Sequence, residues 1–216
     1  FSPYGSNWSN YFDGSGDYLT APDSASSEIG ASDFCVEGWF FPTVSNASYQ
    51  TIFCKNQASI SSGYGPIYIS YKSGTLSCWA SSSSGSWNVL SNVTVGVPTL
   101  NTWNHFVVCR SGSNYGLFLN GVRNSTASGA ATLLNNTANY GIGAQPDGAE
   151  PTNGYLSNIR LVIGSSVYDP TSTTLTVPTS PLTAITNTSL LTCQSNRFLD
   201  NSTNAFTITR NGDTSV

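Results

Sequence analysis

The sequence predicts an all-β fold, an antiparallel β-sandwich, on three observations. Charged residues make up only 8% of the 216 residues, well below the usual share of about 25%. Ser, Thr, Asn and Gly supply the polarity instead, and these residues favour turns and the outward faces of strands over helix interiors. Short apolar runs recur between clusters of turn-forming residues, and none repeats with the helical period. A sandwich of this length usually forms a single unit.

The expected strands follow one another at short intervals along the chain. Each is a run rich in aliphatic or aromatic residues, bounded by clusters of Gly, Ser, Asn and Asp. Many short strands with even turn spacing are typical of a sandwich or a barrel. The expected strands cover residues 18–22, 33–42, 51–55, 66–72, 75–80, 87–95, 104–110, 115–121, 138–144, 154–164 and 189–194.

The most regular stretch, residues 102–124, predicts consecutive antiparallel strands. Alternation places Phe106 and His105 on opposite faces of one strand. Asn120-Gly121 then supplies the positive φ angles that a tight hairpin turn requires. The chain has no second histidine, and no Asp or Ser stands near His105 in a triad arrangement. We therefore expect a packed or hydrogen-bonded histidine rather than a catalytic one.

The run at residues 33–42 is apolar at both of its alternating sets of positions. Such a strand lies in the middle of a sheet with each face covered, or has one face that offers aromatic residues to a ligand. Glu37 lies inside this run, where an unpaired carboxylate would be costly. We expect Glu37 to be tied to a neighbouring arginine or to the backbone.

Charge and the length of the apolar runs argue against nucleic acid and membrane as partners. The net charge is −4, and the seven Lys and Arg residues are scattered singly, so no basic surface for nucleic acid is expected. No apolar run reaches the roughly 18 residues that a membrane span needs, and no signal segment opens the chain. The chain begins at Phe1 and has no methionine, which favours a processed protein or a segment of a longer polypeptide.

Five cysteines lie far apart with no C-x-x-C pair, so a zinc site is not expected. Four of them fall inside apolar runs, where cysteine acts as a small buried hydrophobic residue. The odd count favours free thiols and assembly in a reducing cytoplasm. The alternative is a disulfide pair with one cysteine left over.

Five motifs follow one another over roughly residues 11–193. They are "YFDGSGDYLTAPDSAS", "ASDFCVEGWFFP", "NTWNHFVVCRSGSNYGLFLNGVR", "YGIGAQPDG" and "GYLSNIRLVIGSSVYDP". In this order they resemble the laminin-G-like branch of the concanavalin A-like lectin and glucanase superfamily. The resemblance implies a jelly roll of two antiparallel sheets, one curved into a concave face, over residues 1–195. Residues 196–216 are then a C-terminal extension that packs on the same domain or leads to another module.

Residues 154–194 resemble, in particular, copies of this domain in tail-fibre, knob and other virion proteins of bacteriophages. That resemblance implies a place on the virion surface after assembly in the host cytoplasm. It also implies repeated copies or a homo-oligomer, with other virion proteins as partners.

Glucanases of this superfamily place carboxylates on one strand at E-x-D-x-x-E spacing, and a retaining pair needs carboxyl groups about 5–5.5 Å apart. This chain has no such spacing. Most of its acidic residues stand in expected turns, and only Glu37 lies within a strong strand. We therefore expect a protein that is not an enzyme.

The resemblance also implies a calcium site, because many members of the superfamily hold this ion with early-chain oxygens and a late acidic residue. Asp13 matches the early position, and Asn158 stands at the late position in place of the usual Asp. Calcium takes six to eight oxygen ligands, which loops can provide. Alternatively, Asp13 and Asp17 are turn formers next to glycine.

Carbohydrate binding would need aromatic residues near polar loops, because sugar C–H faces stack on rings and sugar hydroxyls bond to carboxylates and amides. The loop at residues 143–155 is the richest of this kind. The alternative is that the aromatic residues belong to the core. The predicted ligand-binding residues are Gln145, Asp147, Glu150, Asn153 and Tyr155.

These observations lead to three functional hypotheses. The first is a non-catalytic virion surface module, in a fibre, knob or decoration protein, that contacts host cell-surface glycan. The second is a purely architectural module that docks to other virion proteins and binds no sugar. The third, the least favoured, is a polysaccharide hydrolase, which would need two carboxylates facing each other across a groove.

Overall fold

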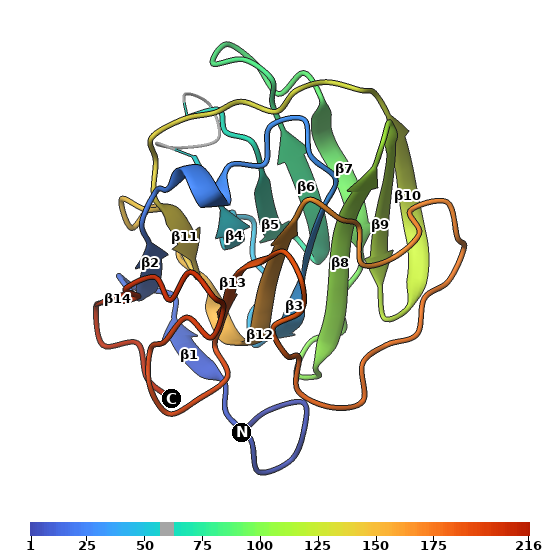
Figure 1. Cartoon of the computed structure of the whole chain (residues 1–216). Helices are drawn as coiled ribbons and strands as arrows, with labels where there is room; N and C mark the ends of the chain where they lie inside the picture. The colour runs from blue at the N-terminus through green and yellow to red at the C-terminus, as the bar shows by residue number, and fades with distance from the viewer. Residues whose placement is uncertain (57–62) are drawn as a thin grey trace.

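The computed structural model of the protein describes residues 1–56 and 63–216, and it confirms the predicted all-β fold. Two seven-stranded antiparallel sheets stack face to face as a sandwich (Figure 1). The helical content is one short 3-10 turn, η1 (Ala25–Ser27), within the described residues. No helix in this part of the chain is long and apolar enough to cross a membrane.

The first sheet, which we call the β8 sheet, has the strand order β1-β12-β3-β8-β9-β10, and β13 also pairs with β12. Asn120 and Gly121, in the turn between β9 and β10, have φ angles of 50° and 82°, as the predicted hairpin requires. The strands are β1 (Asn10–Asp13), β3 (Phe34–Pro42), β8 (Asn104–Ser111), β9 (Asn114–Leu119), β10 (Val122–Ser128), β12 (Asn153–Ile163) and β13 (Thr188–Thr192).

The second sheet, which we call the β5 sheet, has the strand order β14-β2-β11-β4-β5-β6-β7. Its central strands β4, β5, β6 and β7 form a meander of consecutive antiparallel pairs. The strands are β2 (Tyr18–Ala21), β4 (Gln50–Cys54), β5 (Tyr68–Lys72), β6 (Thr75–Ala80), β7 (Leu90–Gly96), β11 (Tyr140–Ile142) and β14 (Thr209–Asn211).

The main core lies between the two sheets and is built from their inward side chains. Phe106 of β8 belongs to it, as do Ile69 and Tyr71 of β5. Alternation along β8 sends Val107 to the outer face, where it joins a second apolar cluster with Phe118. The predicted division of this strand into two faces is thus confirmed.

A long segment between β12 and β13, residues 164–187, covers the outer face of the β8 sheet, and we call it the strap. In Figure 1 it leaves the top of β12, passes outside β8 and β9, and reaches β10. There the Arg123 backbone N–H donates to the Thr173 carbonyl at 2.9 Å, and the Leu175 N–H donates to the Gly121 carbonyl at 2.8 Å. Strand β3 is therefore covered on both faces, by the core and by the strap.

All five cysteines are free and buried, as predicted. Burial raises the pKa of the Cys109 thiol to about 11. Burial also raises the pKa values of Cys35, Cys54, Cys78 and Cys193 above the ordinary thiol value. The thiols therefore stay protonated at neutral pH and serve as packing residues.

Three strands, β1, β10 and β14, were not among those expected. Strand β10 carries Arg, Asn, Ser and Thr and has no run of apolar residues, and its pairing to β9 follows from the hairpin turn. Strand β14 adds an edge to the β5 sheet beside β2. Residues 196–216, which contain β14, also pack Phe198, Phe206 and Ile208 against the main core.

Candidate functional site

The outer face of the β5 sheet carries aromatic and polar side chains that the core does not use. On β5, Ile69 and Tyr71 point into the core, so alternation turns Tyr68 and Lys72 outward. On β6, Trp79 is outward by the same rule, since Cys78 belongs to the core. On this face Tyr68 and Trp79 are buried, whereas Lys72 is half-buried.

Aromatic rings form a continuous row across this face. The centroids of Tyr49 and Trp79 are 5.8 Å apart in an edge-to-face contact, and those of Trp79 and Tyr68 are 5.2 Å apart. Tyr68 then stacks on Trp87 at 5.9 Å, and Trp87 meets Tyr64 at 5.4 Å. Such pairs hold each ring in place through packing on its neighbours. We call these five residues the aromatic row.

A hollow of about 430 Å³ lies at the Tyr49 end of the row. This volume is within the range of about 300–1,000 Å³ that is usual for small-ligand sites. Strands β5, β6 and β7 supply most of its surface, and the polar groups are hydroxyls, one amide and one ammonium. The lining residues are Tyr49, Lys72, Ser73, Thr75, Ser77, Trp79, Asn92 and Thr94.

Two local features of β7 shape this hollow: a register shift in its pairing with β6, and the left-handed backbone of Asn92. Cys78 pairs with Val93, whereas Ala80 pairs with Leu90, so the register shifts between the two pairs. Asn92 lies in the extra length of β7 and has a φ of 54°, in the left-handed region that Asn tolerates better than most residues. Bulges of this kind redirect side chains, and here Asn92 becomes part of the hollow's wall.

The predicted loop reaches the aromatic row from the other side. The Tyr68 hydroxyl donates to the Glu150 carboxylate, and Gln145 Nε2 donates to the same carboxylate at 2.6 Å. Burial and the charge of Glu150 raise the pKa of Tyr68 well above its ordinary value. Gln145 is fully buried, and its Oε1 accepts from Asn56 Nδ2 at 3.0 Å. Gln145 and Glu150 thus lie together at the Tyr68 hydroxyl, which anchors this ring of the row.

Asp147 lies at the exposed tip of the same loop. Its Oδ1 accepts from the Ala149 N–H at 3.1 Å, which closes a local turn. It also lines a smaller hollow of about 240 Å³ together with Asn56, Thr137, Ala138, Asn139 and Pro146. This residue is therefore free to contact a ligand, though not in the hollow beside Tyr49.

Asn153 and Tyr155 lie in β12 rather than in the loop. The Asn153 N–H donates to Gln50 Oε1 at 2.9 Å. Tyr155 packs on the outer face of the β8 sheet, with its ring 4.9 Å from that of Phe1 and 4.8 Å from that of Tyr11. Of the five predicted ligand-binding residues, Gln145, Asp147 and Glu150 thus lie in the loop between β11 and β12, and Asn153 and Tyr155 lie in β12.

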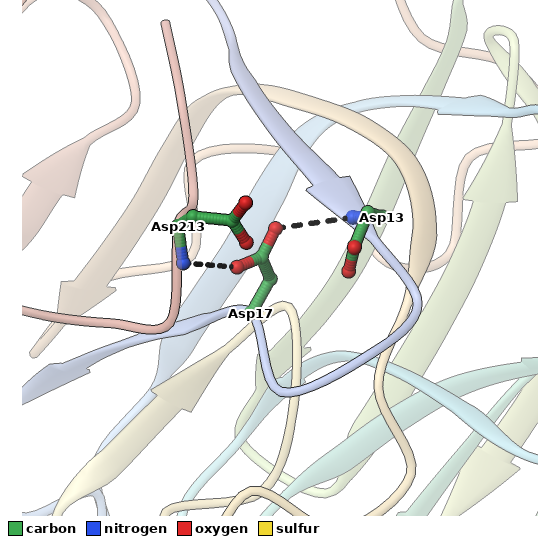
Figure 2. A group of neighbouring side chains, drawn as sticks. All are labelled: Asp13, Asp17 and Asp213. Carbon is green, nitrogen blue, oxygen red and sulfur yellow. Dashed lines mark hydrogen bonds between the residues drawn. The ribbon is translucent and has the colours of Figure 1, made fainter.

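Three carboxylates gather near the chain ends, at Asp13, Asp17 and Asp213 (Figure 2). Their oxygens lie within 4.8 Å of one another, and this is the acidic group in the described residues that could contribute to a cation site. Asp17 Oδ2 accepts from the Asp13 N–H at 3.2 Å, and its Oδ1 accepts from the Asp213 N–H at 2.8 Å. Burial, together with the charge of Asp13, raises the pKa of Asp17. Asp17 is therefore tied to the backbone on either side of it.

Asn158, the second residue of the predicted calcium site, lies apart from Asp13. Asp13 pairs with Asn153, which places Asn158 about 16 Å further along β12 at roughly 3.3 Å per residue. The Asn158 Oδ1 accepts from the Leu182 N–H at 2.8 Å and from Gln194 Nε2 at 2.6 Å. Its side chain is therefore occupied in fastening the strap, and the structure does not bring the two predicted ligands together.

A second hollow, of about 460 Å³, is lined by two carboxylates, Asp33 and Asp169. Both accept backbone hydrogen bonds: Asp33 from the Gly112 N–H of the β8–β9 turn at 2.7 Å, and Asp169 from the Thr171 N–H of the strap at 2.8 Å. The hydrogen bonds from Thr171 lower the pKa of Asp169. A glycosidase needs one carboxyl group with a raised pKa as its acid, and Asp169 has the opposite shift.

Lys72, Asn92 and Thr94 were not predicted from the sequence as candidate binding residues. A signal for them was available in the strand pattern. In "YISYK" and "TLSCWA", alternate positions face the core, and the remaining positions form a set that combines aromatic, hydroxyl and basic residues. A half-covered strand in a sandwich normally has a plainly polar outer set, so outward aromatic residues indicate a binding face.

The comparison with protein families identifies the family of this chain. The family model described as concanavalin A-like lectin/glucanases superfamily (Laminin_G_3) matches residues 13–163. No curated protein matches the chain. The matches among solved structures have low sequence identity, and they establish the fold alone.

Three solved structures show the extent of this similarity. A proposed carbohydrate-binding protein from Bacteroides ovatus has a TM-score of 0.63 at 11% identity, over 95% of this chain and 59% of that one. Domains LG4-5 of the mouse laminin α1 chain have a TM-score of 0.52 at 13% identity, over 79% of this chain and 47% of that one. A heptameric SAP-like pentraxin from Limulus polyphemus has a TM-score of 0.52 at 18% identity, over 75% and 78% respectively. The chain thus spans about half to three fifths of the first two proteins.

Proposed function

The chain belongs to the concanavalin A-like lectin/glucanases superfamily, and we propose that it is a non-catalytic glycan-binding module displayed on a bacteriophage virion. The observation that carries the proposal is the hollow beside Tyr49, where a half-buried aromatic ring, packed on Trp79, stands next to hydroxyl and amide groups.

The hollow offers both kinds of contact that a sugar ring needs. The Tyr49 ring and the edge of Trp79 provide apolar surface for the C–H face of a sugar. Thr94 and Asn92 provide a hydroxyl and an amide at the wall for the sugar hydroxyls. The rings are held by the aromatic row, so little conformational entropy is lost when a sugar binds.

The composition of the lining supports a binding role without catalysis. Glycoside hydrolysis uses two carboxyl groups on either side of the bond that is cleaved. The residues that line the hollow include no Asp or Glu. In the hollow that does contain two carboxylates, Asp33 and Asp169 are held in loop hydrogen bonds. The proposal therefore assigns no hydrolytic step to this chain.

The placement on a virion rests on the resemblance of residues 154–194 to copies of the domain in phage tail-fibre and knob proteins. In such a particle the ligand would be glycan on the host cell surface, and the partners would be other virion proteins. The module would act in several copies, which compensates for a weak single site.

The test is an array of bacterial surface glycans probed with the purified chain and three single variants. Tyr49→Ala removes a ring of the hollow, Asp147→Asn changes the predicted loop, and Tyr155→Ala changes the outer face of the β8 sheet. We expect binding that is lost in Tyr49→Ala and retained in the other two variants. Thermal denaturation of each variant checks that its fold is intact.

Other outcomes would redirect the proposal. Loss of binding in Asp147→Asn alone would place the site at the loop of residues 143–155. Absence of binding by the folded wild-type chain across the array, with association to other virion proteins retained, would favour the architectural alternative.

A further inference from the structure

The charge of the hollow identifies the class of glycan, and this inference rests on the proposed function. We infer that the ligand is an anionic glycan, one whose sugar carries a carboxylate, sulfate or phosphate group that pairs with Lys72. The hollow contains this one basic residue and no acidic residue among those that line it.

Lys72 has no ion-pair partner in the described part of the chain. Its Nζ lies 3.9 Å from the centroid of the Tyr49 ring, in a cation–π contact. The ion pairs of the described residues involve Lys55, His105 and Arg160 and do not include Lys72. The undescribed residues 57–62 contain no Asp or Glu. The ammonium group is thus held over an aromatic ring with its charge unneutralised.

Two other basic side chains, Lys55 and Arg110, are buried and committed to structure. Lys55 is fully buried between Asp23 and Glu28, and Arg110 is buried and donates to backbone carbonyls. Because the chain has a net charge of −4, its overall field does not favour anions. Screening limits that field to about 8 Å at physiological ionic strength. The local charge of Lys72 therefore decides the preference within the hollow.

The remaining lining suits the oxygens of an anionic group. Ser73 and Thr75 flank Lys72 at the β5–β6 turn, and their side chains line the same hollow. Hydroxyl groups can donate to carboxylate, sulfate or phosphate oxygens beside the ammonium. Because the ammonium lies over the Tyr49 ring, the sugar that carries the anion would contact the ring surface that the ammonium leaves uncovered. One ligand residue can thus use the ring and the cation together.

The experiment measures affinity for matched oligosaccharides that differ in one substituent: a neutral form and its carboxylated, sulfated and phosphorylated counterparts. The core oligosaccharide is the best binder on the array described above. The variants are Lys72→Gln, Lys72→Arg and, as a matched control for net charge, Arg197→Gln, because Arg197 is exposed and does not line the hollow. The three acidic forms distinguish which anion is preferred.

We expect wild-type protein to bind at least one acidic form about tenfold more tightly than the neutral form, the size of one charge-assisted hydrogen bond. Lys72→Gln should abolish that preference, measured within each variant as the ratio of acidic to neutral affinity, whereas Arg197→Gln and Lys72→Arg should retain it. Equal affinity for neutral and acidic forms, or a preference that survives in Lys72→Gln, would overturn the inference and leave the proposed function intact. Absence of binding to every form would overturn both.

Discussion

Glu37 places a carboxylate on the covered outer face of the β8 sheet, where water cannot reach it. Its Oε1 accepts from Arg160 Nε at 3.0 Å and from Arg160 Nη2 at 2.5 Å. Its Oε2 accepts from the Tyr168 hydroxyl at 2.8 Å and lies 3.3 Å from His105 Nε2. Burial alone would raise the pKa of Glu37, but the His105 hydrogen bond and the Arg160 charge together hold it below its ordinary value. The carboxylate therefore links β3, β8 and β12 to the strap.

Removing this charge should destabilise the protein strongly. Glu37→Gln leaves the buried Arg160 guanidinium without its counter-ion, and breaking a buried pair in this way costs about 3–5 kcal/mol. We expect the free energy of unfolding, measured by chemical denaturation at pH 7, to fall by about 3 kcal/mol or more. Asp169→Asn, which changes an exposed carboxylate on the strap, is the matched control and should have a small effect.

The pH dependence of the same pair provides an independent check. The folded pKa of Glu37 is depressed, so its stabilisation is present above the ordinary pKa of 4.5 and is lost as pH falls through the folded value. The stability difference between wild type and Glu37→Gln should therefore narrow below about pH 4.5. A difference that stays constant down to acid pH would show that the charge of Glu37 is not what stabilises the fold.

The pKa of Asp17 is shifted in the opposite direction to that of Glu37, so the pH dependence of stability that we expect from Asp17 is also opposite. Its folded pKa is raised, so folding is favoured below the ordinary value of 3.8, and this contribution is lost as pH rises through the folded pKa. Asp213→Asn removes a neighbouring charge but keeps the backbone N–H that donates to Asp17. We expect the variant to be more stable at pH 7 by roughly 0.2–1 kcal/mol, the range for exposed charge pairs.

Thermal melting at several pH values measures this effect. The gain of Asp213→Asn should disappear in acid, where the carboxyl groups of the cluster are protonated. Asp147→Asn removes the same charge from a distant loop and should give no comparable gain. A destabilised Asp213→Asn at pH 7 would mean that the Asp213 carboxylate stabilises the cluster instead of repelling its neighbours.

The environment of an individual residue was predictable only where its chemistry permits a single arrangement. A carboxylate inside an apolar strand must be paired, so a partner for Glu37 was expected, and the structure supplies Arg160. The identity of this partner could not be predicted, because Arg160 lies 123 positions from Glu37 in the sequence. The two residues meet only through the pairing of β3 with β12 in the folded sheet. Lys72 carried no such signal, since an exposed lysine on a strand is usually solvated.

Turns show how strictly a strand connection can specify its residues. Gly121 has a φ of 82°, and an added Cβ would lie 2.9 Å from the Leu175 carbonyl oxygen of the strap. Gly112, in the β8–β9 turn, has a φ of 58° and no atom within 4 Å of its Cβ position. The two glycines share a left-handed backbone and differ in whether the strap packs against them.

This difference leads to a paired prediction. Gly112→Ala should reduce the free energy of unfolding by about 1 kcal/mol, through backbone strain alone. Gly121→Ala should reduce it by roughly 1–3 kcal/mol more, because the new methyl group also displaces the strap. Chemical denaturation of both variants measures the two values. Equal losses would mean that the strap yields at this point without cost.

Strands were predictable where burial imposes a pattern. Strand β8 has two buried faces, so its apolar run is unmistakable. Strand β10 alternates between exposed and half-buried positions along its whole length and has no apolar face. It forms because the Asn120-Gly121 turn returns the chain beside β9 and because the strap bonds to its other edge. Those causes are tertiary, and a local reading of residues 122–128 could not reveal them.

The outer faces of the two sheets differ. The strap covers one of them, and the other carries the hollow that we propose as the binding site. The strap seals the outer face of the β8 sheet with Val167, Tyr168 and Leu175. The outer face of the β5 sheet keeps its hollow open at the Tyr49 end. The predicted site residues were drawn from one stretch of sequence, whereas the hollow takes residues from β5, β6, β7 and the segment before β4. A site assembled from several strands is visible only once the sheet order is known.

An open hollow implies weak binding by one copy and strong binding by many. Most of the lining stays in contact with water, so a single site gains little from desolvation. When copies share one surface, the second contact becomes intramolecular, and avidity can exceed the single-site affinity by roughly 10²–10⁴. We therefore expect the apparent affinity of the chain for immobilised bacterial glycan to rise steeply with the density of the chain. Surface plasmon resonance measures this directly with the chain presented at low and at high density on the particles that are injected.

Particles that carry Tyr49→Ala at high density should give no binding signal, because avidity multiplies a specific contact and cannot create one. An affinity that does not change with density would mean that a single copy saturates the interaction, and the requirement for repeated copies would be lost.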